Sequence, residues 1–357
     1  MPMTDLANYT PRRATGPACR PGEFVFGAIG LDHDHINGMC QGLSDAGAQL
    51  AKVYDPDPAR VNALLARFPE AVAATSEEEI LEDPRIQLVA CAAVPADRAA
   101  AGLKAMEHGK DFFVDKPPLT TLAQLAQAKQ VAERTGRKYG VYYSERIHVE
   151  AAVFAGQLVE QGAIGRVFHV LGTGPHRLSA PSRPSWFFEK ERYGGILCDI
   201  GSHQVEQFLY FTGATDAEIT SSRVANYNHK QFPGLEDFGD CNLVADNGAA
   251  GYFRVDWFTP DGLGTWGDGR MFLIGTEGYI ELRKYVDVAR DPAPGHVYLV
   301  DGKAERRFDI HGQVGFPFFG QFIRDCLDRT DTAMPQQHAF KAAELCVKAE
   351  AAATRLE

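Results

Sequence analysis

The sequence contains no apolar run close to the roughly 20 residues that a membrane-spanning helix needs. It also lacks an excess of basic residues, because 36 Lys and Arg stand against 47 Asp and Glu and give a net charge of −11. An acidic chain repels phosphate backbones and anionic lipids, so neither nucleic acid nor a membrane surface is an expected partner. No internal repeat or low-complexity tract interrupts the 357 residues.

Cysteine is scarce and does not follow the spacing of a disulfide framework or a zinc site. The seven cysteines are scattered, odd in number and without a C-x-x-C pair, which favours free thiols in a reducing compartment. The first 22 residues are polar and rich in proline. Arg12-Arg13 resembles the start of a twin-arginine signal, but no apolar segment follows it. We therefore expect a flexible arm over residues 1–22 and a cytoplasmic protein.

Residues 24–143 alternate short apolar runs with segments of helical period. The predicted strands cover residues 24–29, 50–54, 71–73, 87–91, 112–114 and 138–143. Between them, apolar side chains recur on one helical face, as in residues 122–132. This alternation is typical of βαβ units, so the sequence predicts an α/β fold with a doubly wound parallel sheet.

The second half of the chain has a different pattern. One helix is expected at about 149–161, and after it come long alternating segments such as 252–257, which place one face in a core and one in water. The final periodic segment, 339–354, reads as a helix. We predict a nucleotide-binding domain at 23–145, an α+β domain with a large open, mostly antiparallel sheet at 146–335, and a C-terminal helix at 336–357 that can pack back on the first domain.

The turn after the first strand is a candidate pyrophosphate site. A G-x-G-x-x-G pattern that starts at Gly30 has Asp32 and His35 in place of its second and third glycines. Backbone N–H groups at such a strand-to-helix turn face a bound pyrophosphate, so we expect cofactor contacts from Gly30, Leu31, Asp32 and His33. A carboxylate beside phosphates is unfavourable unless it points away or caps the helix.

An acidic residue at the end of the second strand supports this interpretation. Asp55 lies 25 residues after Gly30, where a carboxylate can accept both hydroxyls of an adenosine ribose. The same carboxylate repels a 2′-phosphate, so NAD is expected rather than NADP. The alternative is a helix-capping turn at residues 55–58, because Asp and Pro are common in such turns.

Two further motifs carry candidate catalytic groups. Lys116 follows the fifth strand, at the carboxyl edge of the sheet where ligands bind in open α/β folds. Asp199 and His203 follow the Gly194-Gly195 turn at i and i+4, so they share one helix face. A histidine can take a hydroxyl proton, an aspartate can orient it, and a lysine can polarise the oxygen. Taken singly, a solvated lysine and an exposed helix pair are the plainer interpretations.

With these motifs, the sequence resembles the Gfo/Idh/MocA family of NAD(P)-dependent sugar and polyol oxidoreductases. The resemblance rests on Gly30, Asp55, Asp115-Lys116-Pro117 and the G-G-x-x-x-D-x-G-x-H run at 194–203. It implies a Rossmann domain followed by a domain with an open sheet, whose free face is used for homo-oligomerisation. It also implies a small sugar or polyol as substrate, and no metal.

The resemblance also implies roles for single residues. Lys116 is then the catalytic lysine that contacts nicotinamide and substrate, His203 is the proton acceptor or donor, and Asp199 is its partner in substrate binding. Trp186 is expected to line the nicotinamide pocket. Further cofactor contacts are expected from Val94, Pro95 and Asp115, and further substrate contacts from Arg146 and His176.

Besides the two glycines that Asp32 and His35 replace in the first turn, two further positions depart from the family pattern. Asp115 replaces the usual Glu, which keeps the charge but shortens the reach. Arg98 stands where many members carry His, and we expect it either to contact the pyrophosphate or to be solvated.

Three alternatives remain open at this point. The first is a redox-neutral enzyme on the same fold, either an NAD-dependent glycosidase or a sugar–sugar oxidoreductase. The second is a sensing protein that binds sugar or nucleotide without catalysis. The third is a metal-dependent hydrolase in which the Asp32–His35 segment binds a metal at the top of an eight-stranded barrel.

Overall fold

Six apolar runs of the first part form a parallel sheet in the order β3-β2-β1-β4-β5-β6. The computed structural model describes residues 9–14 and 16–357. The six strands are β1 (Val25–Ile29), β2 (Gln49–Tyr54), β3 (Val72–Ala73), β4 (Leu88–Cys91), β5 (Asp111–Asp115) and β6 (Tyr139–Tyr142). The prediction of a doubly wound α/β sheet is confirmed, with all six strands at the expected places.

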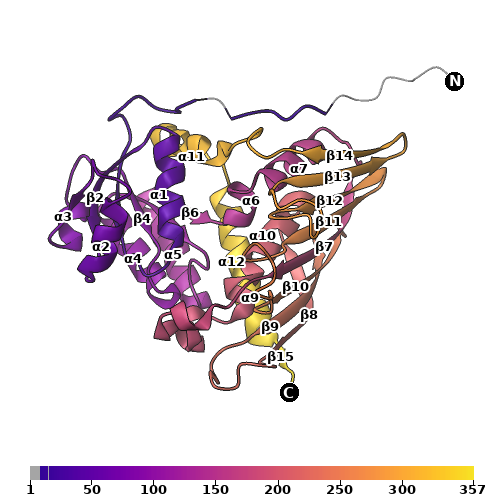
Figure 1. Cartoon of the computed structure of the whole chain (residues 1–357). Helices are drawn as coiled ribbons and strands as arrows, with labels where there is room; N and C mark the ends of the chain where they lie inside the picture. Colours follow the sequence, from indigo (N-terminus) through magenta and orange to yellow (C-terminus); the bar gives the residue numbers. More distant parts are fainter. Residues whose placement is uncertain (1–8, 15) are drawn as a thin grey trace.

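Helices cover both faces of this sheet, as its buried strands require (Figure 1). They are α1 (His35–Asp45), α2 (Pro58–Leu65), α3 (Glu77–Leu81), α4 (Pro95–Glu107) and α5 (Leu122–Thr135). Local chemistry fixes where several of them begin. The Asp57 side chain caps α2, and Thr121 and Gln124 form a reciprocal capping box at the start of α5.

The second part forms a nine-stranded sheet in the order β14-β13-β12-β11-β7-β10-β9-β8-β15. Its strands are β7 (Val167–Pro175), β8 (Ala217–Ala225), β9 (Phe238–Ala245), β10 (Ala250–Asp256), β11 (Arg270–Gly275), β12 (Gly278–Arg283), β13 (His296–Asp301), β14 (Glu305–Asp309) and β15 (Thr354–Arg355). The pairs β7–β10 and β8–β15 are parallel, and the other neighbours are antiparallel. The prediction of a mostly antiparallel second sheet is therefore confirmed.

Helices of the second part lie on the inner face of this sheet, between the two sheets (Figure 1). They are α6 (Ser144–Ile147), α7 (Glu150–Glu160), α9 (Ile196–Asp199), α10 (Gly201–Thr212) and α12 (Gln336–Ala352). The connection between β7 and α9 contains the 3-10 turns η1 (Ala180–Ser182) and η2 (Ser185–Phe188) and the short helix α8 (Lys190–Tyr193), which contacts α4. Helix α10 packs closely on β10, because a Cβ at Gly251 would lie 2.6 Å from the ring of Phe208. Within the described ranges, every helix is too short or too polar to cross a bilayer.

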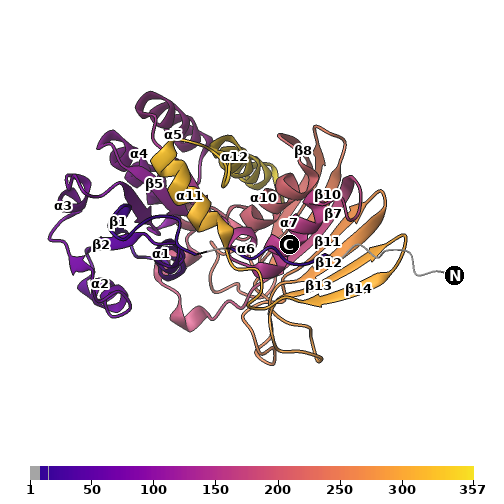
Figure 2. The ribbon, with the colours of Figure 1, turned by 90° about the horizontal axis from the view of Figure 1, so that it is seen from above.

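One late helix returns to the first sheet. The helix α11 (Pro317–Asp328) lies within the segment predicted to belong to the second domain, but it packs on the parallel sheet (Figure 2). Its Phe318, Phe319 and Phe322 rings lie 5.9, 6.4 and 5.2 Å from the ring of Phe113 on β5. The last helix, α12, contacts both sheets, through β6 on one side and β8 on the other.

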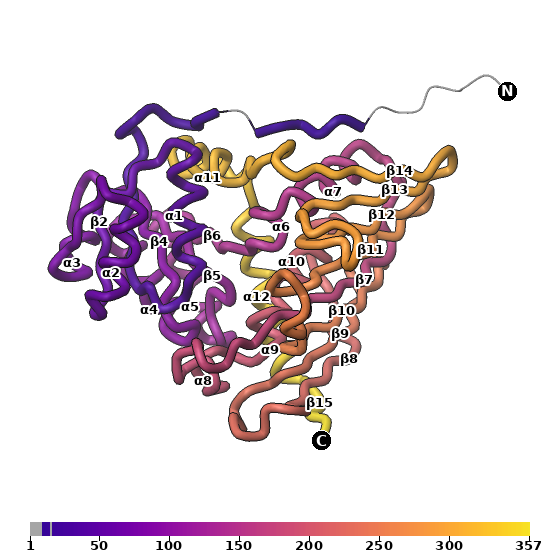
Figure 3. Tube along the Cα trace, viewed as in Figure 1, coloured from indigo at the N-terminus to yellow at the C-terminus, as the bar shows by residue number. Residues whose placement is uncertain are grey.

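The N-terminal segment runs along the molecule from the side of the second sheet to the first (Figure 3). The backbone N–H of Arg12 donates to Gln157 Oε1 at 2.8 Å, and that of Ala18 donates to the Ala46 carbonyl at 2.8 Å. A flexible arm was expected over the first 22 residues. Residues 1–8 and 15 of it lie outside the described residues, and the described part is hydrogen-bonded to both halves of the molecule.

Candidate active site

The predicted catalytic lysine and aspartate meet between the two sheets. Lys116 follows β5, Asp199 ends α9, and their Nζ and Oδ1 atoms lie 2.7 Å apart. Both residues are buried, with exposures of 4% and 7%. A solvated lysine and an exposed aspartate are therefore the wrong interpretations, and the pair joins the parallel sheet to the second part of the chain.

His203 lies one turn further on, in α10, and is also buried. Its Nδ1 atom has no hydrogen-bond partner within the described part of the chain. Asp199 was expected to orient this imidazole, but the side-chain partner that the structure gives Asp199 is Lys116. Burial, together with the positive charge of Lys116, lowers the pKa of His203 well below its usual value. The imidazole is therefore neutral at neutral pH and able to accept a proton.

Asp115, directly before the predicted catalytic lysine, is fully buried and contacts several polar groups. Its Oδ1 accepts the Lys116 backbone N–H at 2.7 Å and lies 2.7 Å from His35 Nδ1. Its Oδ2 accepts from Arg98 at 2.8 Å and lies 3.3 Å from His33 Nδ1. Burial alone would raise the pKa of Asp115, but His35 and Arg98 outweigh it and hold the pKa well below its usual value. Three donors, the Lys116 N–H, Arg98 and His35, thus surround one ionised carboxylate, while His33 Nδ1 accepts the His35 backbone N–H at 3.2 Å.

Arg98 occupies neither of its two expected positions. Its side chain is fully buried, so it is not solvated, and its donors face the protein rather than a pyrophosphate. The guanidinium donates to the carbonyls of Ala93 at 2.7 Å, Lys116 at 2.5 Å and Pro117 at 3.0 Å, besides Asp115. Arg98 therefore holds the Lys116 and Pro117 carbonyls and the side chain of the preceding Asp115 in place around the predicted catalytic lysine.

The metal-hydrolase alternative does not survive the fold. It requires an eight-stranded barrel, whereas the parallel sheet is open and has six strands. Ligand atoms of His33, His35 and Asp115 do lie within 4.8 Å of one another. However, the guanidinium of Arg98 already contacts the same carboxylate, and a cation there disfavours a second one. The contacts of His33, His35 and Asp115 are therefore those of a hydrogen-bond network around Asp115 rather than those of a metal site.

A pocket of about 320 Å³ opens where β1, β2 and β4 end. Its walls are largely apolar and include Ile29, Pro56 and Ala93. Gly30 lies at its rim with φ +58°, and a Cβ there would lie 2.7 Å from Ala93 Cβ, so only glycine fits. The position and lining of this pocket suit the adenosine half of a dinucleotide.

Hydrogen bonds to other parts of the first domain fix the turn after Gly30. The Leu31 N–H donates to Asp55 Oδ2 at 2.7 Å, and the His33 N–H donates to the Ala92 carbonyl at 3.0 Å. The Asp32 carboxylate pairs with Arg60 of α2 at 2.5 Å, which removes the electrostatic objection to a carboxylate in this turn. Asp55 also accepts the Asp57 N–H at 2.8 Å, so it orders the turn, and its contact with a ribose stays a prediction.

The remaining predicted cofactor residues lie on either side of the Lys116 region. Val94 and Pro95 begin α4 and are buried. Trp186 lies in η2 and is 8% exposed, and its Nε1 has no hydrogen-bond partner within the described residues. A buried indole N–H without an acceptor costs free energy, and a bound ligand could supply that acceptor.

The two further substrate candidates differ in surroundings. Arg146 donates to Glu206 at 2.5 Å, and its guanidinium lies 4.2 Å from the centre of the Tyr210 ring. These contacts support a structural role rather than contact with substrate. His176 follows β7 and lies against two tryptophans, with ring centroids 5.5 Å from Trp257 and 4.3 Å from Trp266.

Two buried charges of this region were missed by the sequence analysis. Lys284 and Glu145 form an ion pair in which both side chains are at most 1% exposed. Glu145 follows β6 at the carboxyl edge of the parallel sheet, and this position is a signal that could have identified it. Lys284 follows an antiparallel strand, where position carries no such signal.

Comparison with known proteins places these residues in a family. A model described as an oxidoreductase family with an NAD-binding Rossmann fold matches residues 24–143, and a GFO/IDH/MocA C-terminal domain model matches residues 153–281. This chain belongs to the GFO/IDH/MocA family. As a member, it is an NAD(P)-dependent oxidoreductase, and its parallel sheet is the NAD-binding Rossmann domain of the family.

Named relatives of this family member include two dehydrogenases. The scyllo-inositol 2-dehydrogenase (NAD(+)) of Bacillus subtilis is 29% identical over 295 residues, which are 80% of this chain and 78% of that protein. The D-xylose dehydrogenase of Paenarthrobacter nicotinovorans is 25% identical over 209 residues, which are 57% of this chain and 52% of that protein. The match to the second relative thus spans about half of its length.

Solved structures show the same GFO/IDH/MocA architecture. A crystal structure of a protein from Erwinia carotovora atroseptica has a TM-score of 0.91 and 53% identity, and the match covers 94% of this chain and all of that one. Levoglucosan dehydrogenase in complex with NADH and levoglucosan has a TM-score of 0.76 and 17% identity, with 92% of this chain and 97% of that one covered. The second likeness is one of fold alone.

Proposed function

We propose that this protein oxidises a secondary alcohol of a sugar, glycoside or cyclitol, or reduces the matching ketone, with NAD as redox partner. The observation that carries the proposal is the buried Lys116–Asp199 pair beside a neutral His203 at the carboxyl edge of the dinucleotide-binding sheet. The names of its relatives support the substrate class, because inositol, xylose and levoglucosan are all polyhydroxylated.

The residues present fit a nicotinamide dinucleotide. The pocket beside Gly30 would hold the adenosine half, and Trp186, with its unpartnered N–H, would border the nicotinamide half. The chemistry supplied by NAD, when bound, is acceptance of a hydride from the carbinol carbon, or its return to a ketone.

The chain's own residues handle the proton and the charge on oxygen. In the oxidation direction, neutral His203 takes the proton of the reacting hydroxyl. The Lys116 ammonium donates a hydrogen bond to the same oxygen and stabilises the negative charge that develops there. Asp199 Oδ1 holds the Lys116 ammonium in position. Its other carboxylate oxygen can accept a hydrogen bond from a neighbouring hydroxyl of the substrate. In the reduction direction the same groups act in reverse.

The test is turnover of a polyol panel with NAD, followed by the absorbance of the reduced cofactor. Lys116→Ala and His203→Ala are each expected to lower kcat by about 10²–10⁴-fold, while the affinity for NADH changes little. Lys110→Met is a matched control, because Lys110 is a buried lysine of the same sheet that donates to backbone carbonyls away from the site. Near wild-type turnover in both alanine variants would refute the proposal.

Product analysis in the same assay separates the redox-neutral alternatives. A dehydrogenase yields one ketone and one reduced cofactor for each alcohol consumed. A glycosidase or a sugar–sugar oxidoreductase yields product without net accumulation of reduced cofactor. We expect the first stoichiometry.

A further inference from the structure

Two hydrogen-bond acceptors, the buried Glu145 and the partly buried His176, lie side by side near the predicted proton acceptor His203. Glu145 Oε1 and His176 Nε2 are 3.8 Å apart. The other nitrogen of His176, Nδ1, lies 3.1 Å from the Gly174 carbonyl, which assigns the proton of the neutral ring to Nδ1 and leaves Nε2 as an acceptor. Burial lowers the pKa of His176 to about 4, so the ring is neutral at pH 7. An acceptor thus faces an acceptor, with no proton between them.

The carboxylate of this pair is kept ionised. Its Oε2 contacts Lys284 Nζ and accepts from Gln204 Nε2 at 3.2 Å. Burial alone would raise the pKa of Glu145, but Lys284, His203 and His176 outweigh it and lower the pKa to about 2. Oε1 has no hydrogen-bond partner within the described residues. A buried charged oxygen without a donor is unfavourable, so this arrangement calls for a donor from outside the chain.

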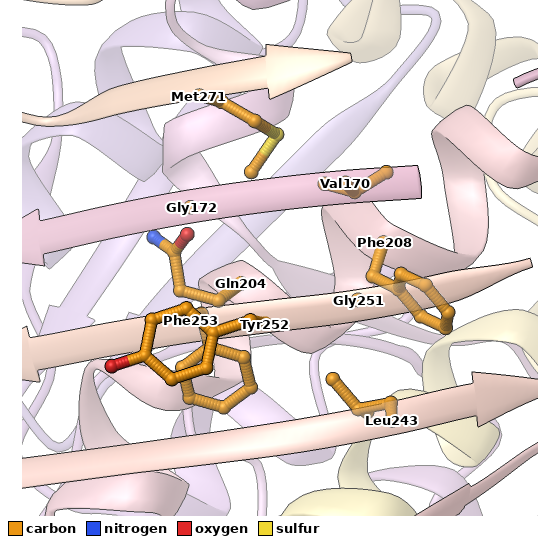
Figure 4. Close-up of a pocket in the computed structure, with 9 residues that line it drawn as sticks. All are labelled: Val170, Gly172, Gln204, Phe208, Leu243, Gly251, Tyr252, Phe253 and Met271. Atoms are coloured by element: carbon orange, nitrogen blue, oxygen red, sulfur yellow. The ribbon is translucent and has the colours of Figure 1, made fainter. Parts of the chain in front are cut away.

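Packing behind the carboxylate fixes its direction. Gln204 of α10 lies against Gly172 of β7, beside a cavity of about 10 Å³ (Figure 4). A Cβ at Gly172 would lie 2.2 Å from Gln204 Oε1, so the glycine makes room for the amide that holds Glu145. The cavity has room for one water at most. The missing donor therefore does not come from a ligand in this cavity.

The surroundings indicate what kind of donor fits. Gln204, which follows His203 directly in α10, donates to Glu145 at 3.2 Å, so the acceptor pair lies beside His203. Trp257 and Trp266 contact the His176 ring in T-shaped geometry. Trp257 is buried, but Trp266 is 42% exposed and provides apolar surface for the C–H face of a ring. An anionic group would be repelled by the ionised Glu145, whereas neutral hydroxyls can donate to it.

We propose that Glu145 and His176 form a specificity subsite that binds a vicinal pair of hydroxyl groups, one on each acceptor, beside the carbon that is oxidised. Lys284 is a positioning residue, because it acts by holding Glu145. This inference rests on the proposed function and narrows its substrate class to neutral polyols with adjacent hydroxyls. It excludes substrates that carry a carboxylate or phosphate at that place.

The test compares polyols with analogues that lack one hydroxyl. The probes are scyllo-inositol and D-xylose with their monodeoxy analogues, measured by kcat/KM with NAD and by calorimetric binding to the NADH-loaded protein. The key variant is the double substitution Glu145→Leu with Lys284→Met, because replacing a buried ion pair by apolar residues of similar volume is generally tolerated. Lys110→Met is again the control for loss of a buried lysine.

Wild type is expected to prefer at least one parent polyol over its deoxy analogue by about tenfold to hundredfold, as a hydrogen bond to a charged acceptor implies. In the double variant this preference should fall below about threefold, because the parent loses affinity while the deoxy analogue is hardly affected. A purely structural role would lower both substrates equally.

Two results would overturn the inference, and they can be told apart. If active wild type and the double variant discriminate equally, the subsite is wrong while the proposed function stands. If folded wild type neither binds nor oxidises any of these polyols, the proposed function fails, and the subsite fails with it. Loss of discrimination in Lys110→Met as well would also overturn the inference.

Discussion

Replacement of Arg98 by methionine tests the claim that one buried guanidinium holds the catalytic lysine in place. The substitution removes the cation beside the fully buried Asp115 and three hydrogen bonds to backbone carbonyls. Loss of one partner of a buried ion pair costs about 3–5 kcal/mol. We therefore expect the free energy of unfolding to fall by about 4 kcal/mol in urea titrations followed by circular dichroism. We also expect kcat to fall, because the Lys116 carbonyl loses its donor.

The control for this prediction is Arg85→Met. Arg85 also pairs with an aspartate, Asp83, but its side chain is 70% exposed, and such pairs contribute about 0–1 kcal/mol. The double variant Arg98→Met with Asp115→Asn also removes the unpaired buried charge of Asp115, so it should recover part of the lost free energy of unfolding. The reasoning is refuted if Arg98→Met unfolds within about 1 kcal/mol of wild type.

Three further predictions concern pH, the cofactor and assembly. The pKa values of the partly buried His148 and His176 are lowered to about 4, chiefly by desolvation, so the unfolded chain binds protons below pH 6.5 that the folded chain takes up only near pH 4. Stability should therefore fall as pH drops through this window, and His148→Gln should reduce the fall in the urea midpoint. Asp55→Ser should weaken the preference for NADH over NADPH in binding titrations, and an unchanged ratio would remove the ribose role. The sequence predicts a homo-oligomer that assembles through the open face of the second sheet, so Leu171→Glu on that face should give a 39.1 kDa monomer by light scattering. A monomeric wild type would contradict the predicted assembly.

The parallel sheet could be predicted because its signals are local. Each strand is a short apolar run between turn residues, and each covering helix shows its own periodicity. Lys116, Asp199 and His203 could be selected as candidates, since each stands at a strand end or after a glycine turn where ligands bind, and their catalytic roles stay predictions. Their burial and the Lys116–Asp199 contact follow from the meeting of the two sheets, which no single motif encodes.

The groups that support these residues could not be found in the same way. Glu145 and Lys284 are 139 positions apart, and neither the charge nor the spacing of one points to the other. Arg98 lies on a helix whose other polar side chains face water, so its sequence context predicts exposure. The guanidinium is buried there because the Asp115 carboxylate and the carbonyls of Lys116 and Pro117 accept its hydrogen bonds. Local sequence patterns therefore do not predict which charged residues from distant segments form ion pairs.

The return of α11 to the first sheet has a consequence for how the protein is made. When the ribosome has released the first 145 residues, every strand of the parallel sheet exists, but Phe113 still lacks the rings of Phe318, Phe319 and Phe322. The nucleotide-binding half therefore completes its core only when the last tenth or so of the chain emerges. Until then the aromatic surface around Phe113 is uncovered, and exposed apolar surface of this kind is what chaperones bind during synthesis.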